Sequence, residues 1–174
     1  MVMQMLAAGG LAVMSDGVRQ ADDHNPDGYF EDERVKQLPF VDDTSWVAEG
    51  RGKALKVISY LLRYLPGSLA YDVLFVRRDL GEVLASQRAM LDAEGTCPGG
   101  PDDAAMADIF ERHLVQVDAW IGAQPNVACL DLAHREILDD PRAAAERIAT
   151  FLGRPLDVDA MAAAVDARLY RVRR

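Results

Sequence analysis

Apolar residues recur along the chain in two patterns, continuous short runs and stretches with helical spacing. The continuous runs are LAVM (11–14), LKVIS (55–59), YDVLFV (71–76) and NVACLDL (126–132). They have the length and composition of parallel strands that are buried on both faces. Between them lie helical patterns, of which the clearest places apolar residues at i, i+3 and i+4 over residues 106–120. This alternation predicts an α/β domain with a parallel sheet.

Further helices are predicted from their spacing and end signals. Residues 31–38 and 42–50 have the pattern of short helices, and a longer helix is expected to begin at about Asp79. Near the end of the chain, Pro141 suits the first turn of a helix and Gly153 suits the position past its end. No internal repeat or low-complexity tract divides the sequence. The 174 residues are therefore expected to form a single domain.

The opening segment MVMQMLAAGG has the end of a helix without a beginning. Its apolar residues share one helical face, and the Gly9-Gly10 pair is typical of a C-terminal stop. No Ser, Thr, Asp or Asn precedes the run as a cap. The run of about eight residues is also shorter than the ~12–15 that an isolated helix needs in water. We interpret the segment as the second half of a helix.

Composition and charge exclude several functional classes. Half of the residues are hydrophobic and 27% are charged, as in ordinary globular proteins. The net charge of −9 argues against general binding to nucleic acid or to anionic membranes. No apolar stretch approaches the ~18 residues of a membrane span. Cys97 and Cys129 are only two cysteines in a chain of this size, which favours a reducing cytoplasm.

The segment FVRRDLGEVLASQ (75–87) contains the most informative pattern. A predicted strand ends just before two arginines, and a helix follows them. Because open α/β sheets bind ligands beyond the carboxyl ends of their strands, Arg77 and Arg78 lie where a ligand is expected. Ser86 falls about two turns into the helix, so that its hydroxyl and the Arg78 guanidinium can close on one phosphate. The alternative is that both arginines lie on the surface and that Ser86 is an ordinary helix serine.

This segment resembles the 3′-phosphate-binding segment of P-loop sulfotransferases, in which a strand ends in V-x-R and a Ser follows eight positions later. Three other passages agree in order and spacing. NPDGYFED (25–32) resembles the N-P-x-G-Y-x-E stretch of bacterial members. LKVIS (55–59) with YLPG (64–67) resembles the strand and Leu-Pro turn before the arginine strand. The last passage, beginning LDLAHREILDDP (130–141), resembles the C-terminal block of strand, acidic turn and F-L-G helix.

The resemblance implies an α/β fold of three layers, a parallel sheet flanked by helices, like that of P-loop nucleoside triphosphate hydrolases. In the family, a glycine-bearing loop after the first strand holds the 5′-phosphosulfate at the start of the first helix. The opening MVMQMLAAGG resembles the segment just beyond that loop. We therefore expect the sequence to be N-terminally truncated, without the first strand and the phosphosulfate-binding loop. An in-frame extension of about 10–20 residues is expected upstream.

The implied reaction is sulfuryl transfer from 3′-phosphoadenosine 5′-phosphosulfate to a hydroxyl or amine, with no metal expected to take part. A carboxylate or histidine should take the acceptor proton. Asp16 and Glu31 are the candidates for this base, although either can instead be a solvated acid of a loop or first helical turn. Lys56 either points toward the sulfate or caps the edge of the sheet. Arg19 could orient an acidic acceptor, and His24 is a weaker candidate for the base.

The C-terminal segment RLYRVRR is basic in an acidic chain. The resemblance implies that Tyr170 and Arg171 cover the nucleotide, and the alternative is a solvated tail. The histidines His113 and His134 and the two cysteines have no metal-ligand spacing and are interpreted as structural.

Three functions are compatible with these patterns. The first is a small bacterial sulfotransferase acting on a small-molecule or peptide acceptor. The second is a non-catalytic relic or nucleotide-binding module that keeps the 3′-phosphate site. The third, another P-loop group transferase such as a kinase, is disfavoured because a nucleoside triphosphate lacks the 3′-phosphate that Arg78 and Ser86 would recognise. No nucleic-acid or membrane partner is expected, and a homodimer is considered.

Overall fold

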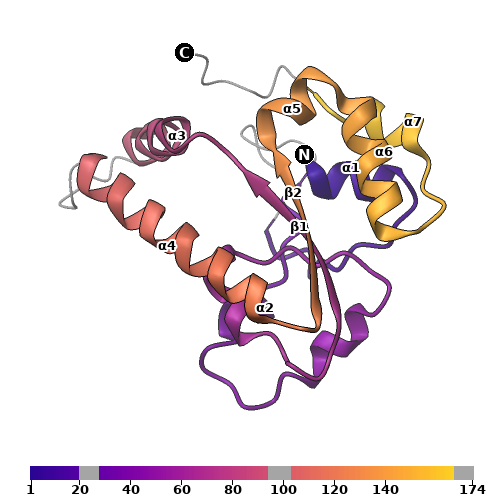
Figure 1. The fold of residues 1–174 in the computed structure, drawn as a ribbon, viewed down its shortest axis with the longest axis horizontal. Helices are drawn as coiled ribbons and strands as arrows, with labels where there is room; N and C mark the ends of the chain where they lie inside the picture. The colour runs from indigo at the N-terminus through magenta and orange to yellow at the C-terminus, as the bar shows by residue number, and fades with distance from the viewer. Residues whose placement is uncertain (20–27, 94–102, 167–174) are drawn as a thin grey trace.

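The computed structural model describes residues 1–19, 28–93 and 103–166 (Figure 1). Helices separate and flank the two strands of these residues. In chain order the α-helices, 3₁₀ helices and strands are α1 (Val2–Ala8), α2 (Arg34–Gln37), η1 (Ser45–Gly50), η2 (Ser59–Tyr64), β1 (Tyr71–Arg77), α3 (Leu80–Ala93), α4 (Asp103–Ala123), β2 (Val127–Ala133), α5 (His134–Asp139), α6 (Pro141–Leu152) and α7 (Val158–Ala163).

The sheet of the described residues consists of β1 and β2, which run parallel. Their register extends from Tyr71 opposite Val127 to Arg77 opposite Ala133. Both strands are apolar runs of seven residues, and the connection between them contains α3 and α4, as a parallel crossover requires. The prediction of an α/β domain with parallel strands at 71–76 and 126–132 is thus confirmed.

Each face of this sheet packs against helices, which lie on either side of the strands in Figure 1. On one face, Leu74, Leu130 and Leu132 contact the core of α1, α5, α6 and α7. On the other face, Phe75 packs with Val117 of α4 and with η2. The structure is therefore a mixed α/β fold with a two-stranded parallel sheet between helices. The described residues do not include the larger sheet of a three-layer P-loop fold, so that part of the prediction is not confirmed.

Two predicted strands are not strands among the described residues. From the run at 11–14, only Val13 pairs, in an isolated parallel bridge with Ala54. The run at 55–59 passes without regular structure into η2, which begins at Ser59. A strand exists only where a neighbour supplies a ladder of hydrogen bonds, and here the single bridge joins Val13 to Ala54, just before the run at 55–59. The predicted helices at 31–38 and 42–50 are shorter than expected, a single α turn (α2) and a 3₁₀ helix (η1).

The predicted helix ends are confirmed at α6 and α1. Pro141 occupies the first turn of α6, Asp140 caps it by accepting a hydrogen bond from Ala143 N at 3.0 Å, and Gly153 ends it with a φ of 60°. No side chain caps the start of α1. At its end, a Cβ on Gly9 would lie 2.6 Å from Met161 Cγ, so glycine permits α1 and α7 to pack closely. None of the described helices is both long and apolar enough to cross a membrane.

Candidate functional site

A cavity of about 1280 Å³ lies beside β1, on the side away from β2. The whole length of β1 forms one wall, and segments 28–30 and 50–57, the start of α1 and part of α4 form the others. The cavity reaches the carboxyl ends of both strands, where Arg77, Arg78 and His134 line it. Ligands of open α/β sheets bind at this end of the strands.

The charged residues that line the cavity are mostly basic. Asp72 is the one acid among the described lining residues, and the six Arg and Lys residues are Arg51, Lys53, Lys56, Arg77, Arg78 and Arg154. This excess of cations contrasts with the net charge of −9 of the whole chain. Several of the cations are paired with carboxylates of neighbouring segments, which fix their positions. The cavity is therefore suited to an anionic ligand.

Arg77 and Arg78 leave the end of β1 in different environments. Arg77 donates from Nε to Asp131 and from Nη2 to Asp118, both at 2.6 Å, and these two bonds raise the pKa of its guanidinium. Arg78 donates from Nε to Glu82 Oε2 at 3.2 Å and is about one quarter exposed. An Arg–Glu pair one helical turn apart presents the guanidinium beside the start of α3. Arg77 is thus held between two carboxylates, and Arg78 is held by Glu82 at the start of α3.

His134 follows β2 directly and lies beside this arginine. Burial lowers the pKa of its imidazole, and the charge of Arg78 lowers it further. Since the ordinary pKa of histidine is about 6.5, the lowered pKa makes His134 neutral at pH 7. The sequence assigned His134 a structural role, and the structure adds that it lines the same cavity as Arg78.

The other predicted nucleotide-binding residues are described less fully. Ser86 lies within α3, about two turns after Arg78 as expected, but its side chain is outside the described part of the structure. Tyr170 and Arg171 lie outside the described residues altogether. The pairing of Arg78 with Ser86 on a phosphate therefore remains a prediction.

Glu31 contacts Lys56, a residue that lines the cavity, although the two are 25 residues apart. Lys56 Nζ donates to Glu31 Oε1 at 2.9 Å and to the carbonyl oxygen of Tyr29 at 3.3 Å. Arg19 Nη1 lies 3.5 Å from the same carboxylate oxygen, and its guanidinium stacks on the Tyr29 ring. Burial tends to raise the pKa of Glu31, but Lys56 and Arg19 outweigh it, so the pKa is lowered. Glu31 is therefore an ionised carboxylate held beside the cationic cavity wall.

Phe30, which precedes Glu31, has a φ of 51°, in the left-handed region that non-glycine residues rarely adopt. It lines the cavity together with Gly28 and Tyr29. Such conformations cost energy and are found disproportionately at functional sites. The turn at Phe30 sets the position from which Glu31 meets Lys56.

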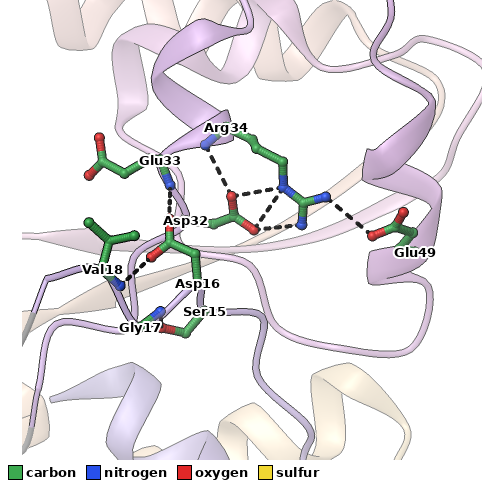
Figure 2. Close-up of polar contacts among 8 residues, drawn as sticks. All are labelled: Ser15, Asp16, Gly17, Val18, Asp32, Glu33, Arg34 and Glu49. Carbon is green, nitrogen blue, oxygen red and sulfur yellow. Dashed lines mark hydrogen bonds and ion pairs between the residues drawn. The ribbon is translucent and has the colours of Figure 1, made fainter.

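Asp16, the other candidate base, accepts backbone hydrogen bonds with both carboxylate oxygens (Figure 2). Glu33 N donates to Oδ2 at 2.6 Å and Val18 N donates to Oδ1 at 2.9 Å. These bonds lower the pKa of Asp16. The carboxylate thus joins the segment after Met14 to the start of α2, which is a structural role in addition to the one predicted.

A buried ion pair beside Asp16 was not recognised in the sequence (Figure 2). The Asp32 side chain is 2% exposed, and it accepts hydrogen bonds from Arg34 Nε and Nη2 at 3.0 and 2.8 Å. Arg34 also donates to Glu49 at 3.3 Å and stacks on Trp46. The hydrogen bond from Arg34 is the largest influence on Asp32 and lowers its pKa despite burial. In the sequence, the only signal for this ion pair was the Asp-x-Arg spacing at the start of a predicted helix.

Ser59 and His113 form a second unrecognised contact. Ser59 Oγ lies 2.9 Å from His113 Nε2, and both residues line the cavity. The Tyr60 ring packs against the imidazole at a centroid distance of 6.1 Å. The contact joins η2 to α4 across the cavity wall, in agreement with a structural role for His113.

In residues 1–19, 28–93 and 103–166, no group of three or more His, Cys, Asp or Glu residues is placed to hold a metal ion. Neither a protein-family model nor a curated protein nor a solved structure matches the chain.

Proposed function

We propose that the protein binds an adenosine nucleotide carrying a 3′-phosphate and, as a sulfotransferase, moves a sulfuryl group from 3′-phosphoadenosine 5′-phosphosulfate to a hydroxyl or amine. The observation that carries the proposal is a cavity lined by basic residues that reaches the carboxyl ends of β1 and β2, in a chain whose net charge is −9. A P-loop-like sheet of three layers, with its ligand at this end, is part of the proposal.

Arg78 is the residue that we assign to the 3′-phosphate. It follows β1, lines the cavity and stands two turns before Ser86 on α3. A guanidinium donates to phosphate through two parallel N–H groups, which a lysine cannot reproduce. The Glu82 carboxylate accepts a hydrogen bond from Arg78 Nε and so holds the guanidinium at the start of α3.

Lys56 and Glu31 are assigned to the sulfuryl group and the acceptor. Sulfuryl transfer resembles phosphoryl transfer, in which the protein supplies positioning and charge stabilisation. Lys56 Nζ is a suitable donor to sulfate oxygens, and the ionised Glu31 can accept the proton of the attacking hydroxyl or amine. The lowered pKa keeps Glu31 deprotonated at neutral pH, as a proton acceptor must be. We propose a cytoplasmic location, where the protein would encounter this co-substrate.

Replacing Arg78 by alanine is expected to weaken binding of adenosine 3′,5′-bisphosphate by roughly 10- to 100-fold, because hydrogen bonds to a charged group contribute ~1.5–3 kcal/mol. Binding of adenosine 5′-monophosphate should change little, since it has no 3′-phosphate. Isothermal titration calorimetry with both nucleotides measures the two effects.

Arg135→Ala is the matched control, because Arg135 forms an exposed i,i+4 pair with Asp139 outside the cavity. It should leave both affinities unchanged. Equal losses for the two nucleotides in Arg78→Ala would show that Arg78 serves the fold or the 5′ side, and absence of bisphosphate binding in the unaltered chain would reject the proposal.

Glu31→Gln tests the assignment of the base. If Glu31 takes the acceptor proton, sulfuryl transfer to a panel of phenols and amines should fall by about 10²- to 10⁴-fold, with bisphosphate affinity retained. Asp16→Asn should instead lower thermal stability with a smaller effect on transfer, because both Asp16 oxygens hold backbone amides. The reverse ranking would assign the base to Asp16. Bisphosphate binding without transfer to any acceptor would favour a nucleotide-binding module.

A further inference from the structure

The edge of β1 opposite β2 has a regular set of backbone groups that the sheet does not use. Tyr71 N donates to Asn126 O at 2.9 Å, toward the β2 side. In a parallel ladder, alternate residues direct N–H and C=O to opposite sides of a strand. The backbone groups of Asp72, Leu74 and Val76 therefore face away from β2. Among the described residues, β1 pairs with no strand other than β2.

The cavity extends along this open edge of β1. Asp72, Leu74 and Val76 all line it, and Val76 is 40% exposed. Among the described residues, none of β2 lines the cavity, although His134 just past its end does, so the space along β1 lies beside its open edge. The open edge thus faces a preformed space rather than a packed neighbour.

The walls of this space are apolar on both sides of the sheet plane. From the side of α1 they include Val2, Leu6 and Leu11, which belong to or pack against the core of α1, α6 and α7. From the side of α4 they include Val57, Leu62 and Leu114. An occupant in the sheet plane would therefore meet apolar side chains on both of its faces.

These features together specify the occupant. Only an extended backbone presents donors and acceptors at the spacing of Asp72, Leu74 and Val76. A strand covered on both faces has a continuous apolar sequence rather than an alternating one. Among the lining residues, Arg51, Lys53 and Arg154 are exposed cations, which favours a peptide with acidic flanks and disfavours one with basic flanks.

We propose that the open edge of β1 binds an extended apolar peptide segment of about seven residues, the length of β1, flanked by acidic residues, as an additional strand. This goes beyond the nucleotide site, which lies past the end of β1 at Arg78. Main-chain hydrogen bonds to three β1 residues supply affinity, and the apolar walls supply selectivity.

The first test uses the unaltered chain and a synthetic peptide of seven Val, Ile and Leu residues with two Glu at each end. The matched control is a peptide N-methylated at alternate amides, because methylation removes the N–H groups that would donate to β1. Loss of these hydrogen bonds together should weaken binding by at least about 10-fold. Because either set of alternate amides can face β1, both N-methylated peptides are compared. Fluorescence anisotropy of labelled peptides gives the affinities. One methylated set should bind much more weakly than the other, and equal binding of all three peptides would overturn the proposal.

Amide hydrogen exchange then locates the peptide. Binding should slow exchange at Asp72, Leu74 and Val76, whereas the amides of Tyr71 and Val73 already face β2 and should change less. Absence of added protection at the three open-edge amides would overturn the proposal. A dimer that persists in sedimentation at saturating peptide would also overturn it, because a second copy would then occupy the edge.

Val76→Pro provides a test within the chain. It removes an N–H that faces the cavity and spares the hydrogen bonds between β1 and β2. Peptide affinity should fall relative to Val76→Ala, which loses the side chain but keeps the N–H. Equal affinities in two folded variants would contradict the proposal, and the N-methylated peptides decide it if Val76→Pro does not fold. No nucleotide is present in these measurements, so failure here is distinct from failure of the nucleotide site.

Discussion

Replacing Ile148 by alanine is expected to lower the free energy of unfolding by about 2–5 kcal/mol. Ile148 lies in α6, is 0% exposed and belongs to the core that α1, α6 and α7 form against Leu132 of β2. Truncation removes buried methyl groups and leaves a cavity that the surrounding helices fill only in part. For a chain of this length, the thermal midpoint should fall by about 5–15 °C.

Chemical denaturation and thermal melting followed by circular dichroism measure this effect. Val115→Ala is the matched control, because Val115 lies on α4 with 68% of its surface exposed. Its effect should remain within about 0.5 kcal/mol. A loss below 1 kcal/mol in Ile148→Ala would contradict the packing of α6 against the sheet.

The second large effect is expected from Arg34→Ala. The change leaves the buried carboxylate of Asp32 without its guanidinium partner and retains only the backbone hydrogen bond from Arg34 N at 3.0 Å. Removal of one partner of a fully buried pair typically costs ~3–5 kcal/mol. Because Arg34 itself is 46% exposed and water can reach the site, we expect a smaller loss of about 2–4 kcal/mol. Chemical denaturation at neutral pH measures it.

The same pair predicts a dependence on pH. Arg34 lowers the pKa of Asp32 below its ordinary value in the folded protein. The stabilisation that the Asp32–Arg34 pair contributes is therefore fully present above the pKa of Asp32 in the unfolded chain, about 3.9. It is lost as the pH falls through the lower pKa of Asp32 in the folded protein. The stability difference between the unaltered chain and Arg34→Ala should narrow below about pH 4. A difference that is constant down to pH 2 would contradict this coupling.

Arg135→Ala is again the control, because both members of the Arg135–Asp139 pair are more than 60% exposed. Exposed pairs contribute about 0–1 kcal/mol. A loss in Arg135→Ala equal to that in Arg34→Ala would show that burial of Asp32 has no energetic effect.

Local sequence signals predicted the elements whose stability depends on local chemistry. The position of Pro141 in the first turn of α6 and of Gly153 past its end was predicted because φ preferences act within a few residues. The apolar runs of β1 and β2 were predicted because both strands are covered by helices on their two faces. The runs at 11–14 and 55–59 were equally apolar, but a strand also needs a neighbour in register, which an apolar run does not specify.

In the candidate site, too, the sequence predicted the local features, and the tertiary structure decided the contacts between distant segments. The sequence by itself placed Arg77 and Arg78 at the end of a strand, because strand ends and the helix that follows are local features. It also selected Glu31 and Lys56 by resemblance, but their 2.9 Å contact joins residues 25 positions apart. The burial of Asp32 under Arg34, the capture of Asp16 by backbone amides and the basic cavity beside β1 were decided by tertiary structure alone. Such features depend on which distant segments exclude water from a group, and no local pattern of residues encodes that neighbourhood.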